Sequence, residues 1–173
     1  MAASRTARVL AVICALGALS ACQSLMPSAG PQARLEPKSG SSVGGTVSFT
    51  QSGGAVLVSA SLTGLKPNAE HGFHIHEKGD CSAADATSAG GHFNPAAAAH
   101  GHRGAAHHAG DMPNIRADAG GNARYEARLE GVTLDGPQGL AGRSVVVHRD
   151  PDDYKSQPAG NSGPRIACGL IHG

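Results

Sequence analysis

The chain is poor in aromatic residues, because only 3% of its 173 residues are Phe, Trp or Tyr and tryptophan is absent. A hydrophobic core must therefore be built mainly from Val, Leu, Ile and Ala. Charge is also scarce and balanced, since 14 basic residues stand against 13 acidic ones. This balance excludes the strongly basic surface that nucleic-acid binding requires, so we expect no nucleic-acid partner.

Long hydrophobic runs are lacking except for one, from Val9 to Leu19, which follows Arg5 and Arg8. It is too short to cross a membrane as a helix, and a short apolar run after basic residues is typical of a secretory signal peptide. We predict that residues 1–21 are this signal. The ending Leu-Ser-Ala-Cys resembles the bacterial lipoprotein box, which predicts that Cys22 is lipidated. The alternative is an ordinary signal peptide that happens to contain a cysteine.

Removal of residues 1–21 leaves 152 residues with 12 basic and 13 acidic side chains, enough for one domain. Residues 22–42 are rich in Pro, Ser and Gly and have no sustained periodicity, so we interpret them as a lipidated tether before a domain at 43–173. Gln23, in place of an acidic residue after Cys22, resembles lipoproteins of the outer membrane. The prediction is a periplasmic protein with a lipid anchor in the cell envelope, in the outer membrane.

Alternation of apolar and polar residues indicates β-strands throughout this domain. The stretches are Thr46 to Thr50, Val56 to Leu62, Ala123 to Leu129, Ser144 to His148 and Arg165 to Ile171. No stretch supports a long amphipathic helix. We predict an all-β, immunoglobulin-like sandwich or barrel with two long functional loops.

Histidine is concentrated in one region, because eight of the ten histidines lie between His71 and Asp111. In a β-strand His74 and His76 share a face, so both imidazoles point the same way. Imidazoles with one carboxylate suit zinc and copper alike. The alternative is a His-rich tract that binds metals loosely, without a defined site.

Cysteine is scarce, with four residues, and two of these belong to the predicted signal and anchor. Cys14 leaves with the signal peptide and Cys22 carries the lipid. Cys81 and Cys168 remain as an even pair in an oxidising compartment, so we expect a disulfide between them.

Five motifs in a fixed order make the metal hypothesis specific. They are GFHIHEKGDCS, GGHFNP, HHAGDMPNI, VVVHRDPDDY and RIACGLI. Together they resemble copper/zinc superoxide dismutase of the bacterial periplasmic type, over residues 43–173. The resemblance implies an eight-stranded Greek-key barrel that binds one copper and one zinc ion per subunit and converts superoxide to oxygen and hydrogen peroxide, protecting the cell envelope.

The resemblance also implies the ligands. Copper would bind His74, His76, His92 and His148, and zinc would bind His92, His100, His108 and Asp111. His92 would bridge both ions and exchange a proton during catalysis. His107 competes with His108 for the zinc role.

Two further residues acquire roles from the resemblance. Asp152 would accept hydrogen bonds from His74 and His100 and so orient both rings, with Asp153 and Asp150 as alternatives. Arg165 would attract the superoxide anion beside the copper ion. Lys155 is a weaker candidate for steering.

We expect the two remaining histidines, His71 and His172, to be ordinary surface or strand-end residues. Two other functions compete with dismutation. One is a metal-storage protein without turnover, and the other is a zinc hydrolase, which would need an open zinc position. Monomer and homodimer are both compatible with the sequence.

Overall fold

The structure is a computed structural model, and it describes residues 30–173. The strands are β1 (Gln32–Pro37), β2 (Gly44–Ser52), β3 (Ala55–Thr63), β4 (Glu70–His71), β5 (Phe73–His76), β6 (Ile115–Arg116), β7 (Ala123–Glu130), β8 (Ser144–His148) and β9 (Arg165–His172). The only helical element in this part of the chain is one short 3-10 turn, η1 (Thr87–Ala89). Between residues 30 and 173 no helix is long and apolar enough to cross a membrane.

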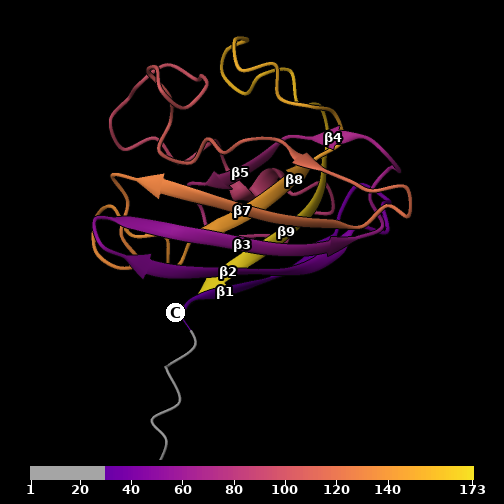
Figure 1. The fold of residues 1–173 in the computed structure, drawn as a ribbon, viewed down its shortest axis with the longest axis horizontal. Coiled ribbons are helices and arrows are strands. Elements are labelled where there is room, and N and C mark those ends of the chain that lie inside the picture. The colour runs from indigo at the N-terminus through magenta and orange to yellow at the C-terminus, as the bar shows by residue number, and fades with distance from the viewer. Residues whose placement is uncertain (1–29) are drawn as a thin grey trace, which may run out of the picture.

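Seven strands form one antiparallel sheet in the order β5-β8-β9-β1-β2-β3-β7, and β4 pairs with β6. Figure 1 shows β5, β8 and β9 crossing the other strands at an angle, so that the sheet curls around a core. Only Gly72 separates β4 from β5, and counting these two as one interrupted strand gives eight strands. β3 pairs with β7 and β5 pairs with β8, so the chain crosses between strands that are not consecutive, as in a Greek key, and β9 lies beside β1. The predicted all-β barrel is confirmed.

The core follows from alternation along the strands. In β3 the side chains of Val56, Val58, Ala60 and Leu62 are buried and those between them are exposed, so every second side chain faces the interior. Aromatic packing is limited to a few places, such as the edge-to-face contact of Phe73 with Tyr125, whose ring centroids are 5.1 Å apart. The other buried side chains are mainly aliphatic, as the composition predicts.

The sheet extends further towards the N-terminus than residue 43, where the sequence resemblance begins. β1 lies inside the segment assigned to the tether, and it pairs with both β2 and β9. Ala33 and Leu35 face the core, with 1% and 3% of their surface exposed, while Arg34 and Glu36 face solvent. Burial of these two side chains and two ladders of hydrogen bonds hold the segment in the sheet. Residues 1–29, with the predicted signal peptide and Cys22, lie outside the described residues.

Two long segments connect the strands on one side of the barrel, residues 77–114 and 149–164, and Figure 1 shows them projecting away from the end at which β1 begins. A disulfide between Cys81 and Cys168 joins the first of these segments to β9, across a sequence separation of 87 residues. The predicted disulfide is confirmed.

Candidate metal centre

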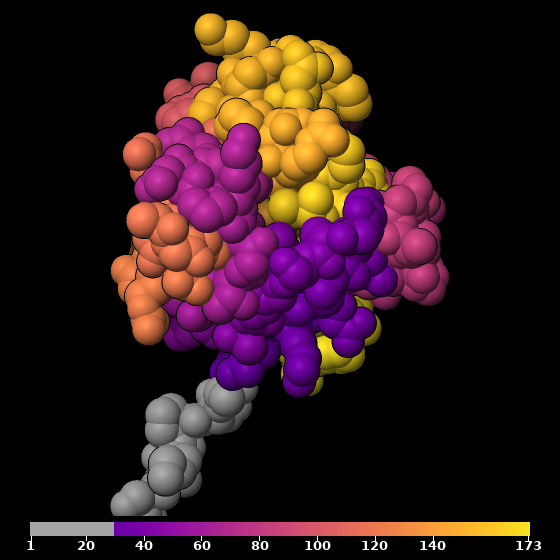
Figure 2. Space-filling view, turned by 90° about the vertical axis from the view of Figure 1, so that its right-hand side faces the viewer, coloured from indigo at the N-terminus to yellow at the C-terminus, as the bar shows by residue number. Residues whose placement is uncertain are grey.

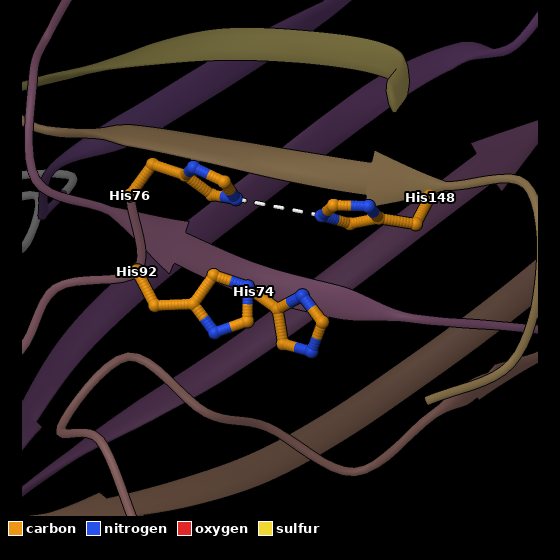
Figure 3. Close-up of side chains that lie close together, drawn as sticks. All are labelled: His74, His76, His92 and His148. Atoms are coloured by element: carbon orange, nitrogen blue, oxygen red, sulfur yellow. Dashed lines mark hydrogen bonds between the residues drawn. The ribbon is translucent and has the colours of Figure 1, made fainter. Parts of the chain in front are cut away.

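Strand geometry brings together the first cluster of histidines. His74 and His76 are two residues apart on β5, which pairs with β8, and β8 ends at His148. His92 joins them because its main chain forms an isolated β-bridge with His76. All four rings are buried, and Figure 3 shows them converging from the two strands and the loop.

The hydrogen bonds of this cluster determine which nitrogens carry lone pairs. The Nδ1–H of His76 donates to the carbonyl oxygen of Gly90 at 2.9 Å, and the Nδ1–H of His148 donates to that of Gly163 at 3.1 Å. Each neutral ring then has a lone pair on Nε2. These two Nε2 atoms lie 3.4 Å apart, as the dashed line in Figure 3 marks. Two facing lone pairs repel one another unless a cation lies close to both.

The second cluster lies in the long 77–114 segment and shares His92 with the first. Its members are His92, His100, His108 and Asp111. Nδ1 of His100 is 3.0 Å from Oδ2 of Asp111, although the Nε2–H of His100 already donates to another carboxylate. A lone pair therefore faces a carboxylate, and His100 Nδ1 is among the buried nitrogens that have no hydrogen-bond partner in the described chain. The arrangement fits a cation held between them.

His92 belongs to both clusters because its two ring nitrogens point in different directions. Nδ1 lies 2.8 Å from Oδ1 of Asp111, in the second cluster. Nε2 is buried and has no hydrogen-bond partner among residues 30–173, as is also true of Nδ1 of His74. These donor sets, four imidazoles and three imidazoles with one carboxylate, fit copper and zinc respectively.

Burial sets the charge state of the metal-free clusters. It lowers the pKa of His74, His76 and His148, to about 4 for His148, because an imidazolium would lose its hydration there, and the neighbouring His92 lowers each pKa further. Burial alone would raise the pKa of Asp111. Hydrogen bonds from His92 and from a main-chain N–H outweigh it and bring that pKa to about 2. Neutral imidazoles and an ionised carboxylate are the forms that bind metals.

Asp152 connects the two clusters through hydrogen bonds to one histidine of each. Its carboxylate is fully buried and accepts hydrogen bonds from Nε2–H of His74 at 2.8 Å and of His100 at 2.9 Å. Both Nδ1 atoms are thereby left with lone pairs. The backbone of Asp152 is held in turn by Asn114, through bonds of 2.8 and 3.0 Å. The two alternatives take other partners, since Asp153 caps its own turn at Lys155 and Ser156 and Asp150 pairs with the exposed Arg149.

Arg165 begins β9 directly opposite His148 in the register of the sheet. Its guanidinium donates to the carbonyl oxygens of Ala86 at 2.6 Å and Gly90 at 2.7 Å. The Gly90 oxygen also accepts the Nδ1–H of His76, so a single carbonyl links the arginine to a histidine of the first cluster. Its positive charge contributes to the lowered pKa of both His76 and His148.

A buried pair of histidine clusters joined through one imidazole, with an arginine beside it, is the arrangement that the sequence resemblance implied. The profile of the copper/zinc superoxide dismutase family matches residues 43–171. The chain belongs to this family.

Known members and a solved structure support this assignment. A copper-zinc superoxide dismutase of Aquifex aeolicus is 45% identical over 133 residues, which cover 73% of this chain and 78% of the relative. One from Cordyceps militaris is 45% identical over 138 residues, covering 75% of this chain and 89% of the relative. The crystal structure of a double mutant of a SOD-like protein from Bacillus subtilis superposes with a TM-score of 0.74 at 35% identity, covering 82% of this chain and 97% of the other.

The additional histidines of this superoxide dismutase lie outside both clusters. His107 directs Nδ1 to the carbonyl oxygen of Ala105, whereas His108 lies in the second cluster. His102 packs its ring edge to face with Tyr154. His172 is exposed at the end of β9, as predicted, and Lys155 is exposed in the 149–164 segment.

His71 differs from the prediction, because it is buried with 1% of its surface exposed. It ends β4, and its Nδ1–H donates to the main-chain oxygen of His148 at 3.0 Å. The sequence did hold a signal for this burial, because the period of two puts His71 in line with the buried Phe73 and Ile75.

Gly160 is a further residue that the sequence did not identify. Its φ is +61°, and a Cβ at this position would collide with the carboxylate of Asp152 and the ring of His100. Glycine is needed here both for the left-handed conformation and for the space. The only signal in the sequence is its position eight residues after Asp152.

Proposed function

We propose that this chain catalyses the dismutation of superoxide to oxygen and hydrogen peroxide, with copper held by His74, His76, His92 and His148 and zinc held by His92, His100, His108 and Asp111. The observation that carries the proposal is the shared ring of His92 between two buried clusters, one of which lies beside Arg165. Copper held there would supply the electron exchange between two superoxide ions. The rest of the chemistry depends on the protein's own side chains.

His92 is the residue placed to hold a proton. An imidazole that serves both clusters uses Nδ1 and Nε2 together and must give up its N–H. Its Nε2 lacks any other partner in the described chain, so this nitrogen can take up a proton and later release it to the peroxide product. Asp111 keeps the ring in place from the opposite side, through Nδ1.

Arg165 is placed to attract the substrate. Burial lowers its pKa, yet a guanidinium remains charged at physiological pH. Two carbonyl oxygens hold the charge close to His76 and His148 without neutralising it. A fixed positive charge near a reaction site raises the association rate of a small anion, and salt screens this effect.

The experiment that tests the function combines metal analysis with a superoxide-decay assay on the purified protein. We expect about one copper and one zinc per chain, with activity. Copper and zinc without activity would favour a metal-storage protein. Hydrolytic activity without copper would favour a zinc hydrolase, which the four side chains of the second cluster argue against.

The role of Arg165 is tested with Arg165→Ile over a series of salt concentrations. The variant should retain both metals, lose most of its activity at low ionic strength, and show a flatter decrease of rate with salt. Arg124, exposed on β7, is a matched control, because Arg124→Ile removes the same charge from a strand that contributes no residue to either cluster. Full activity with an unchanged salt slope in Arg165→Ile would refute the steering role.

The location of the enzyme is a separate proposal. We infer that it protects the cell envelope from superoxide, attached through lipidated Cys22 after removal of residues 1–21. The disulfide between Cys81 and Cys168 is in keeping with an oxidising compartment such as the periplasm. Replacement Cys22→Ser should abolish labelling with a radioactive fatty acid and release an active enzyme from the membrane fraction. A labelled, membrane-bound Cys22→Ser protein would contradict the anchor.

A further inference from the structure

The turn at residues 38–42, which joins β1 to β2, contacts the strand that carries Arg165. Ser39 Oγ–H donates to the main-chain oxygen of Arg165 at 2.8 Å. The next residue of β9 is held twice, because the oxygen of Ile166 accepts bonds from Ser41 Oγ–H and from the main-chain N–H of Lys38, the latter at 2.9 Å. The main chain at the base of the arginine is therefore fixed by side chains of this turn.

The same turn also holds the loop that binds the guanidinium. The N–H of Ser39 donates to the oxygen of Ala84 at 2.8 Å, and Nζ of Lys38 donates to the oxygen of Cys81. Two residues beyond Ala84, the oxygen of Ala86 accepts a hydrogen bond from Arg165. In Figure 2 the indigo segment that contains the turn lies between the yellow C-terminal segment and the pink loop.

Ser39 has an unusual backbone conformation that points to a use for its hydroxyl. Its φ is +51°, in the left-handed region that glycine occupies most easily. A serine at such a position carries a conformational cost that the neighbouring contacts must sustain. The contact that a glycine would lack is the hydrogen bond from Oγ to the oxygen of Arg165.

We propose that Ser39 and Ser41 are positioning residues for Arg165, holding its main chain while Lys38 and the N–H of Ser39 hold the loop that binds its guanidinium. The disulfide at Cys168 joins the same loop to β9 three residues further on, so the turn supplies a second and independent connection. The expected effect of the turn on catalysis rests on the proposed steering role of Arg165. The expected effect of the turn on the mobility of the Arg165 guanidinium is independent of that role.

The test compares the double variant Ser39→Gly, Ser41→Ala with wild type. Glycine removes the hydroxyl of Ser39 without adding strain, because φ is already positive. Ser42→Ala is the matched control, since Ser42 lies in the same turn, is exposed, and its hydroxyl forms no hydrogen bond within residues 30–173. Metal content and the disulfide should be unchanged in both variants.

Three measurements are made on the mature protein. In zinc-loaded, 15N-labelled protein, the order parameter of the Arg165 Nε–H should fall below about 0.6 in the double variant only. In copper-loaded protein, the affinity for azide, used as a small anionic probe, should weaken. The kcat/KM for superoxide at low ionic strength should fall about threefold to tenfold, because small displacements of a positioned group reduce rate strongly.

An unchanged order parameter and azide affinity in the double variant would overturn the proposal, as would an equal loss in Ser42→Ala. If the wild-type protein showed no dismutation, the proposed function would fail. The order parameter of Arg165 in zinc-loaded protein would still decide whether the turn positions the arginine.

Discussion

Replacement of Asp152 with asparagine tests the link between the two clusters most sharply, because the two carboxylate oxygens accept different numbers of hydrogen bonds. Oδ1 accepts two hydrogen bonds, from Nε2–H of His100 at 2.9 Å and from the main-chain N–H of Tyr154 at 2.6 Å. Oδ2 accepts one, from Nε2–H of His74 at 2.8 Å. An asparagine has only one side-chain oxygen to offer, and we expect this oxygen to occupy the position with two donors.

In the Asp152→Asn variant the side-chain amide nitrogen would then face Nε2 of His74, donor against donor. His74 can avoid this contact by moving its proton to Nδ1, the nitrogen that has no other partner in the described chain and that would bind copper in the proposed site. Loss of a partner that orients a metal-binding histidine reduces metal affinity about 10- to 100-fold, or roughly 1.4 to 2.8 kcal/mol. His100 keeps its acceptor, so zinc affinity should fall by less than copper affinity.

The assay is competition with a chelator, performed separately for copper and for zinc on wild type and Asp152→Asn. Asp153→Asn is the control, because Asp153 lies next in the chain, is exposed, and bonds to its own turn rather than to a histidine. Equal losses of the two metals, or a larger loss of zinc, would show that the reasoning from the two oxygens is wrong.

Three other predictions follow from the same geometry. His148→Ala should remove copper and activity while zinc remains, and His108→Ala should weaken zinc, which elemental analysis measures; loss of both ions from both variants would contradict the assignment. In metal-free protein, urea titrations should show that the free energy of unfolding decreases as pH falls from about 6.5 towards about 4, because the unfolded chain protonates histidines that stay neutral when buried. The lowered pKa of His148 alone corresponds to about 3 kcal/mol. A free energy of unfolding that does not change over this pH range would refute the prediction. The pKa of Asp111 is lowered because hydrogen bonds favour its ionised form in the folded protein. The stability that this carboxylate contributes is therefore lost only below pH 3.8, as pH falls towards 2. Cys168→Ser should cost up to about 4 to 5 kcal/mol by the chain-entropy account, which thermal unfolding tests, with an unchanged midpoint as the contrary result.

The residues on strands were the most predictable part of the site. Alternation alone places His74 and His76 on one face, and the even count of cysteines pairs Cys81 with Cys168. The histidines in the 77–114 segment have no such periodicity, so their grouping required either the resemblance or the structure. Whether His107 or His108 joins the second cluster depends on the local conformation of a loop, because the side chains of adjacent loop residues have no regular orientation.

The carboxylate that links the clusters and the first strand were harder to predict, for different physical reasons. Asp150, Asp152 and Asp153 lie too close in sequence for spacing to separate them, and only the tertiary contacts distinguish their partners. β1 was missed because a six-residue strand with two buried side chains, one of them alanine, gives little alternation among prolines and glycines. Its stability comes from pairing with β9, which lies more than 120 residues away in the chain.

The central place of β1 determines how the barrel bears a mechanical load. Its neighbours are β9 on one side and β2 on the other, and it begins beside the end of the chain, where Gln32 pairs with His172. A force applied through residue 30 would have to shear both ladders along a strand of roughly 20 Å before it reached the turn beside Arg165. An edge strand would instead peel away one bond at a time. The barrel is thus joined to whatever precedes it through a strand that resists extraction, and Figure 1 shows that β1 begins at the end of the barrel away from the two long segments.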